Sequence, residues 1–155
     1  MDWYEFLKVI HVLAAATWVG TAISSQVLGM KAAKAMAAGD VPTMINYVED
    51  QELLGKRLYA PASGIALIAG ILMVIDSWEF TDTWIIIGIA IWAISTAVGI
   101  LYFTPETPKL LAGLREGKQG DPAFQAAVKK ITLVSRIDTL LLIAVVADMV
   151  IKPGA

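Results

Sequence analysis

The chain has 155 residues and a formal net charge of −2, with 57% hydrophobic and 17% charged residues and no cysteine. Soluble domains average about 45–50% apolar and about 25% charged residues, so this composition, with a mean hydropathy of +0.69, indicates an integral membrane protein in a lipid bilayer. The weakly acidic charge argues against nucleic acid as a partner. Absence of cysteine excludes disulfides, thiolate metal sites and cysteine nucleophiles. The length suits a single domain over residues 1–155.

Four segments are long and apolar enough to cross a membrane, which takes about 20 mostly apolar residues. The first is preceded by Asp2 and Glu5, not by a basic stretch, so we expect a retained helix and no cleaved signal peptide. The fourth carries charged residues near both of its ends. The predicted fold is therefore all-α, an integral membrane four-helix bundle. The expected helices cover about residues 6–30, 58–75, 84–103 and 132–151.

The loop charges predict the orientation of the bundle. Lysine and arginine are concentrated between the first and second helices and between the third and fourth, whereas the connection between the second and third has none. The positive-inside rule then gives an N-out/C-out arrangement with two long cytoplasmic loops. Aromatic residues typical of a membrane interface mark the expected outer boundary: Trp3, Tyr4, Trp78, Phe80 and Trp84.

Both cytoplasmic loops are expected to be partly helical. The first helix should continue as far as Gly39, a residue that favours a helix end, and the Asp40 to Pro42 stretch should open a short amphipathic helix. Pro105 and Pro108 should end the third helix, because proline disrupts a helix interior. Residues 117–122 read as a turn, after which a helix capped by Asp121 should run directly into the fourth segment.

His11, the only histidine, is the sharpest chemical signal in the sequence. We expect it to face the bundle, because a polar side chain facing lipid is costly. It could be a hydrogen-bonded packing residue near the outer interface or an axial ligand to haem iron. Ala14 and Ala15 would leave room for a flat macrocycle against Trp18. A second ligand would have to be methionine, lysine, water or a residue of another subunit. The helical stripe it belongs to is His11, Ala15, Trp18, Ala22 and Ser25.

The outer end also offers an alternative copper site. Methionine sulfur suits Cu(I), and histidine with carboxylates can bind a divalent metal. The candidate ligands are His11, Asp148, Met73 and Met149. Asp148 has a second interpretation, an ion pair with Lys152 four residues later.

At the inner end, the simplest interpretation of the charged residues is a structural ion pair of Asp138 with Arg57 or Arg136. The functional alternative is that these basic residues recognise anionic groups such as porphyrin propionates or lipid headgroups. No phosphate-binding loop, dinucleotide fingerprint, GxSxG or HExxH motif is present, so catalytic residues cannot be assigned and enzymatic activity stays open.

Three blocks carry a resemblance to a known group: YEFLKVIHVLAAATWVG (4–20), GKRLYAPASGIALIAGILMV (55–74) and TLLLIAVVADMVIKPG (139–154). In them the chain resembles the HemJ-type protoporphyrinogen oxidases and the broader superfamily of small bacterial four-helix membrane proteins that includes CopD-like copper proteins. The resemblance implies haem b bound through His11, with roles for Lys8 and Arg57. The third helix lacks the polar residues of HemJ, and the Asn-Glu-x-Pro of HemJ is Ser-Arg-Ile-Asp at 135–138, so haem binding is a firmer expectation than oxidase activity.

Three functions follow as hypotheses. The first is a haem-b-binding membrane protein that transfers electrons or oxidises a tetrapyrrole. The second is a non-enzymatic accessory subunit of a larger membrane complex, or a homo-oligomer. The third is copper binding or transport at the outer face. The expected location is a bacterial or archaeal plasma membrane.

Overall fold

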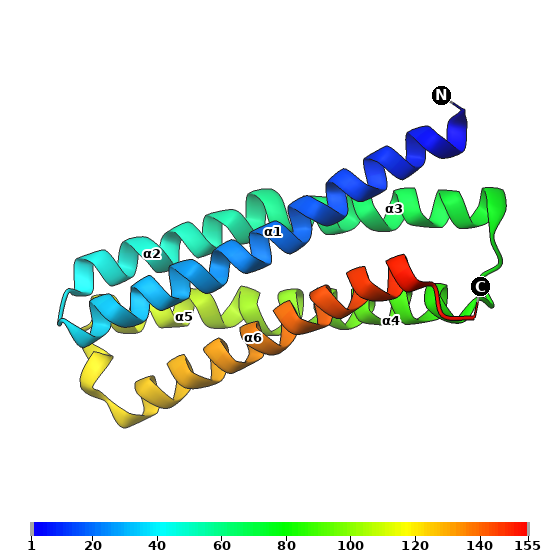
Figure 1. Cartoon of the computed structure of the whole chain (residues 1–155). Helices are drawn as coiled ribbons and strands as arrows, with labels where there is room; N and C mark the ends of the chain where they lie inside the picture. The colour runs from blue at the N-terminus through cyan, green and yellow to red at the C-terminus, as the bar shows by residue number, and fades with distance from the viewer. Residues whose placement is uncertain (1, 155) are drawn as a thin grey trace.

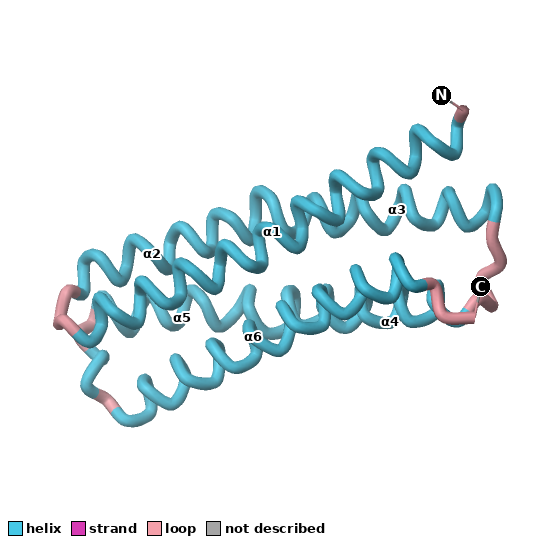
Figure 2. The backbone as a smooth tube through the Cα atoms, in the orientation of Figure 1, coloured by secondary structure: helices cyan, strands magenta, loops and turns pink. Residues whose placement is uncertain are grey.

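The computed structural model describes residues 2–154, which form helices joined by short loops, without a strand in that range. The prediction of an all-helical fold is confirmed. Figure 1 shows the chain as long helical rods that run side by side, and Figure 2 shows that the loops are confined to the ends of these rods. In chain order the elements are α1 (Trp3–Ala37), α2 (Val41–Leu54), η1 (Gly55–Tyr59), α3 (Ala60–Ser77), α4 (Thr83–Val98), η2 (Gly99–Phe103), α5 (Thr104–Arg115), η3 (Lys118–Gly120) and α6 (Pro122–Ile151).

Three rods are long and apolar enough to cross a membrane: Trp3–Ala37, Val41–Ser77 and Thr83–Arg115. The second joins α2, η1 and α3, and the third joins α4, η2 and α5. The fourth rod, α6, is of similar length, but three charged residues interrupt its apolar stretch: Arg136, Asp138 and Asp148.

Helix ends follow the capping residues that the sequence indicated. The Asp40 side chain accepts a hydrogen bond of 3.2 Å from the backbone N–H of Thr43, and Asp121 accepts one of 2.8 Å from Ala123. Gly39 has a positive φ of 73°, a backbone conformation that glycine adopts without strain. The predicted end of the first helix, the new helix after Asp40 and the continuous helix from Pro122 to Ile151 are therefore confirmed.

The prediction that Pro105 and Pro108 end the third helix is wrong. The helix continues through both prolines. The turn immediately before Pro105, η2, is a widened π turn. Proline lacks an N–H and its ring clashes with the carbonyl four residues earlier, and a π turn relieves this locally. The Thr104 hydroxyl donates to the Gly99 carbonyl oxygen at 2.9 Å. The second rod repeats this design, with η1 starting at a glycine and ending two residues before Pro61.

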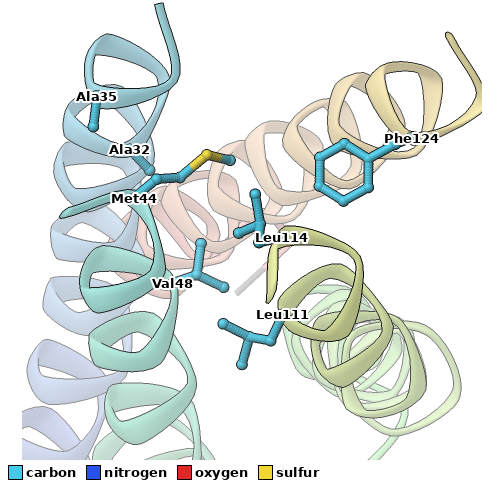
Figure 3. Packing of buried hydrophobic residues seen from close by; sticks show 7 residues of the cluster. All are labelled: Ala32, Ala35, Met44, Val48, Leu111, Leu114 and Phe124. Carbon is cyan, nitrogen blue, oxygen red and sulfur yellow. The ribbon is translucent and has the colours of Figure 1, made fainter. Parts of the chain in front are cut away.

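The two ends of the bundle are built differently. One end, the charged half (residues 24–54 and 104–136), has an apolar interior in which α1, α2, α5 and α6 meet (Figure 3). Its outer surface carries ion pairs such as Arg115 with Glu49 at 2.7 Å. This is the pattern of a bundle in water. Its buried cluster consists of Ala32, Ala35, Met44, Val48, Leu111, Leu114 and Phe124.

The other end, the apolar half (residues 3–23, 60–98 and 137–151), shows the opposite pattern. Large hydrophobic side chains face outward, among them Leu13, Ile68 and Leu140, each more than 60% exposed. Its interior holds small and polar residues, such as Ala66 and Ser95, beside larger ones such as Trp18 and Leu142. Close packing through small residues is typical of helices in lipid, so this half is the part suited to the bilayer.

Candidate functional site

His11 lies on α1 with its ring against α3. Its Nδ1 is 2.7 Å from the carbonyl oxygen of Ala66. Because a carbonyl oxygen only accepts, Nδ1 must carry the proton, and in the neutral ring the lone pair is then on Nε2. Gly70 leaves the space for this contact, since a Cβ there would be only 3.1 Å from His11 Cε1. The prediction that His11 faces the bundle is confirmed.

The other residues expected around His11 are spread along the bundle. Lys8, one turn earlier on α1, is exposed and its Nζ lies 5.7 Å from the centre of the Tyr4 ring. Ala15 is half-buried, and Trp18 is 5% exposed in the interior. Arg57 belongs to η1 and is exposed. Together His11, Ala15 and Trp18 form a stripe that leads from the apolar half toward the middle of the molecule.

The proposed copper ligands gain no support from the geometry. The Met149 methyl group fills the space beside Gly88 of α4, and among residues 2–154 no group of three histidine, aspartate or glutamate side chains could hold a metal ion. The expected ion pair of Asp148 with Lys152 is not formed. Instead, Lys152 Nζ lies over the Trp78 ring, 4.1 Å from its centre, because an ammonium is attracted to the face of an indole.

A hydrogen-bonded centre joins the helices where the two halves meet. The Tyr59 hydroxyl donates to Asp138 Oδ2 at 2.7 Å, and Ser95 Oγ lies 2.6 Å from the same hydroxyl oxygen. The Trp18 ring packs edge-on against Tyr59, with ring centres 5.8 Å apart. Each of the four rods thus contributes one side chain to this site, which we call the central polar cluster: Trp18, Tyr59, Ser95 and Asp138.

The predicted ion pair of Asp138 with Arg57 or Arg136 is therefore wrong. Asp138 is 6% exposed, while Arg57 and Arg136 are exposed, and the Tyr59 hydroxyl takes the place expected for a guanidinium. Two buried atoms of the cluster lack a hydrogen-bond partner, the acceptor Asp138 Oδ1 and the donor Trp18 Nε1. Buried polar atoms are nearly always paired, so such exceptions call for an explanation.

Further polar contacts extend from the cluster toward the charged half. The Gln26 amide donates to Ser135 Oγ at 2.8 Å and to Thr139 Oγ1 at 2.9 Å. Gln51 of α2 donates to the Ser25 carbonyl oxygen at 2.8 Å. These groups link α1 to α6 and α1 to α2 through hydrogen bonds, which are a common means of holding helices together in membranes.

Residues 5–153 match the model of a family described as predicted integral membrane protein (DUF2269). The chain belongs to this family. No curated protein and no solved structure gave a match. Membership confirms the membrane class of this DUF2269 protein over almost its whole length, and it does not single out the HemJ-type or CopD-like groups.

In this DUF2269 protein, sequence reasoning missed the central polar cluster. Neither Tyr59 nor Ser95 stands out in the sequence, because a tyrosine near the end of an apolar segment is typical of a membrane interface and a serine within one is typical of close helix packing. The sequence does contain one signal for the cluster: Asp138 lies inside an apolar helix, and an aspartate there needs hydrogen-bonding partners from other helices. Two of the expected apolar segments, around residues 58–75 and 84–103, each hold a side chain able to supply a hydroxyl.

Proposed function

We propose that this protein binds haem b within the membrane, with His11 Nε2 as an axial ligand to the iron. The observation that carries the proposal is the contact between His11 Nδ1 and the Ala66 carbonyl oxygen. Histidines that bind metals almost always donate their other ring N–H to a carbonyl or carboxylate, which fixes the tautomer and the ring orientation. The donor chemistry of His11 therefore fits haem iron.

Other residues near His11 could contact the ring or the propionates of a bound haem. Ala15 lies on the same stripe of α1 and offers a small surface, and Trp18, which packs against Tyr59, would bound the site on its inner side. Lys8 is exposed one turn from His11, where its ammonium could pair with a propionate, and Arg57 offers a guanidinium nearer the charged half. When bound, haem supplies reversible one-electron exchange. The functional class that follows is electron transfer or tetrapyrrole oxidation.

The test is an absorption spectrum of the protein in mild detergent after incubation with haemin, oxidised and reduced. We expect a Soret band that shifts on reduction, that is lost in His11→Gly, and that returns when imidazole is added to this variant. Thr17→Ala is the matched control, because Thr17 is exposed on the same helix. No haem uptake by the unsubstituted protein, or uptake that His11→Gly leaves unchanged, would refute the proposal.

We also infer that α6 is a fourth span and that both termini lie outside. Asp138 is buried inside the bundle and Asp148 is half-buried, so these two carboxyl groups do not face lipid. The basic residues of both long loops belong to the charged half or, for Lys56 and Arg57, to η1 at its border, and the positive-inside rule puts them in the cytoplasm.

The natural absence of cysteine makes single-cysteine labelling of intact cells a direct test of the orientation. A membrane-impermeant maleimide should label Ser77→Cys and should not label Lys118→Cys until the cells are opened. The reverse order would refute the orientation.

The other two functions remain predictions. Copper bound by His11, Asp148, Met73 and Met149 would appear in metal analysis after loading, and no contact in the structure favours it over haem. Assembly as an accessory subunit or a homo-oligomer in a bacterial or archaeal plasma membrane would appear as a larger particle in mild detergent.

A further inference from the structure

The central polar cluster holds a carboxyl group that burial leaves without a charged partner. Asp138 is 6% exposed, and no lysine or arginine among residues 2–154 forms an ion pair with it. Burying an ionised group without compensation is expensive, and ionisable residues within membrane helices commonly mark proton or ion pathways. The second carboxyl oxygen, Oδ1, has no hydrogen-bond donor, so the negative charge of an ionised Asp138 would be only partly compensated.

The hydrogen bonds of the cluster can run in two directions. With Asp138 ionised, the single Tyr59 proton goes to Asp138 Oδ2, so Ser95 Oγ must donate to the Tyr59 oxygen. With a proton on Asp138 Oδ2, the carboxyl donates to the Tyr59 oxygen and the Tyr59 hydroxyl turns to Ser95. The same three oxygen atoms accommodate one proton more or less without any change in helix packing.

The surroundings of Asp138 differ on its two sides along α6. Toward the charged half lie polar side chains, with Gln26 bonded to Ser135 and Thr139. Toward the apolar half, the next turns of α6 bring Leu142, which is fully buried, and Val145, 8% exposed. Along α6, a proton at Asp138 therefore has polar groups on one side and apolar side chains on the other.

We propose that Asp138, with Tyr59 and Ser95, forms a proton-binding site that exchanges with water on the side of the charged half. One proton is taken up or released at the carboxyl group, and no other bond changes. Tyr59 of η1 contacts Asp138 directly, and Ser95 of α4 and Trp18 of α1 contact Tyr59. Arg57, two residues from Tyr59, and Arg136, two residues from Asp138, are exposed. This proposal does not depend on haem, because its test uses haem-free protein.

The test is infrared difference spectroscopy of the protein in lipid vesicles, recorded between acid and alkaline pH. We expect the carbonyl band of neutral carboxylic acids to grow on acidification and to shift in D2O, and we expect one component of it, the band of Asp138, to be absent in Asp138→Asn. Tyr59→Phe keeps the ring and removes the donor, so it should shift the frequency and the pH midpoint of the band. Asp148→Asn is the control and should leave the band in place.

Persistence of the whole band in Asp138→Asn, or a band that pH does not change, would overturn the site. So would a band that changes with sodium concentration at constant pH, since that would indicate a metal cation as the occupant.

The side from which the proton enters is tested with a pH jump applied to one face of oriented vesicles. The signal should follow only the face that carries Lys118, and Gln26→Leu should slow it. Equal response from both faces would overturn the one-sided access.

Discussion

Replacing Leu114 with alanine should lower the free energy of unfolding by about 2–5 kcal/mol, the usual range for removing a buried leucine side chain. Leu114 is 1% exposed and lies in the apolar interior of the charged half, among residues of α1, α2, α5 and α6 (Figure 3). The surface there carries charged residues, so unfolding exposes this side chain to water. Denaturant unfolding of the detergent-solubilised protein, followed by far-UV circular dichroism, measures the loss.

Leu53→Ala is the matched control for this experiment. Leu53 belongs to α2 in the same half but is 56% exposed, and substitutions at such surface positions usually change stability by no more than about 0.5 kcal/mol. Equal losses in the two variants would show that the interior of the charged half is not packed as described.

The Gly113→Ala substitution should destabilise the protein by about 1–3 kcal/mol, the usual cost of overpacking an interior. A Cβ at Gly113 would lie 2.7 Å from Phe124 Cε2 and 2.9 Å from Phe124 Cδ2. A phenyl ring cannot bend, so relief of the contact requires the ring to leave its rotamer or α5 to move away from α6. A double-mutant cycle with Phe124→Leu tests this cause, because the smaller side chain should remove most of the penalty of Gly113→Ala.

Gly20→Ala provides the opposite expectation within one chain. Apart from the neighbouring turns of α1 itself, no described atom lies within 4 Å of the position that its Cβ would take, and α1 is helical there. Alanine at a helix position that it fits usually stabilises by about 0.4–1 kcal/mol, because the unfolded chain has fewer conformations to lose. Destabilisation by Gly20→Ala would contradict the open space beside this residue, and a Gly113→Ala variant of unchanged stability would contradict the described contact between α5 and α6.

The helices and most of their ends were predictable because the signals are local. Apolar runs gave the long rods, and aspartate caps, aided by the prolines at 42 and 122, gave the starts of α2 and α6. The continuation through Pro105 was not predictable by the same means. Proline ordinarily ends or kinks a helix, and whether a widened turn absorbs it depends on packing against the rest of the bundle.

The candidate sites were predictable in part. The stripe around His11 identified the inward face of α1, and the contact with Ala66 confirms that face, while haem and copper remain predictions. The partner of Asp138 could not be foreseen. The choice between an arginine and Tyr59 depends on how the helices are rotated about their axes, and the identity of residues along one helix does not fix this rotation.

The π turns η1 and η2 change the direction in which the side chains of the two middle rods point around the helix axis. An α-helix places side chains about 100° apart around its axis, and a π turn holds roughly one additional residue. Each of these turns therefore rotates every later side chain of its rod by about that angle. The turns lie at the junction of the two halves, where the interior changes from an apolar cluster to one that also contains buried polar side chains. Because of the additional residue at each junction, a single continuous helix turns one face to the interior of the charged half and a different face to the interior of the apolar half.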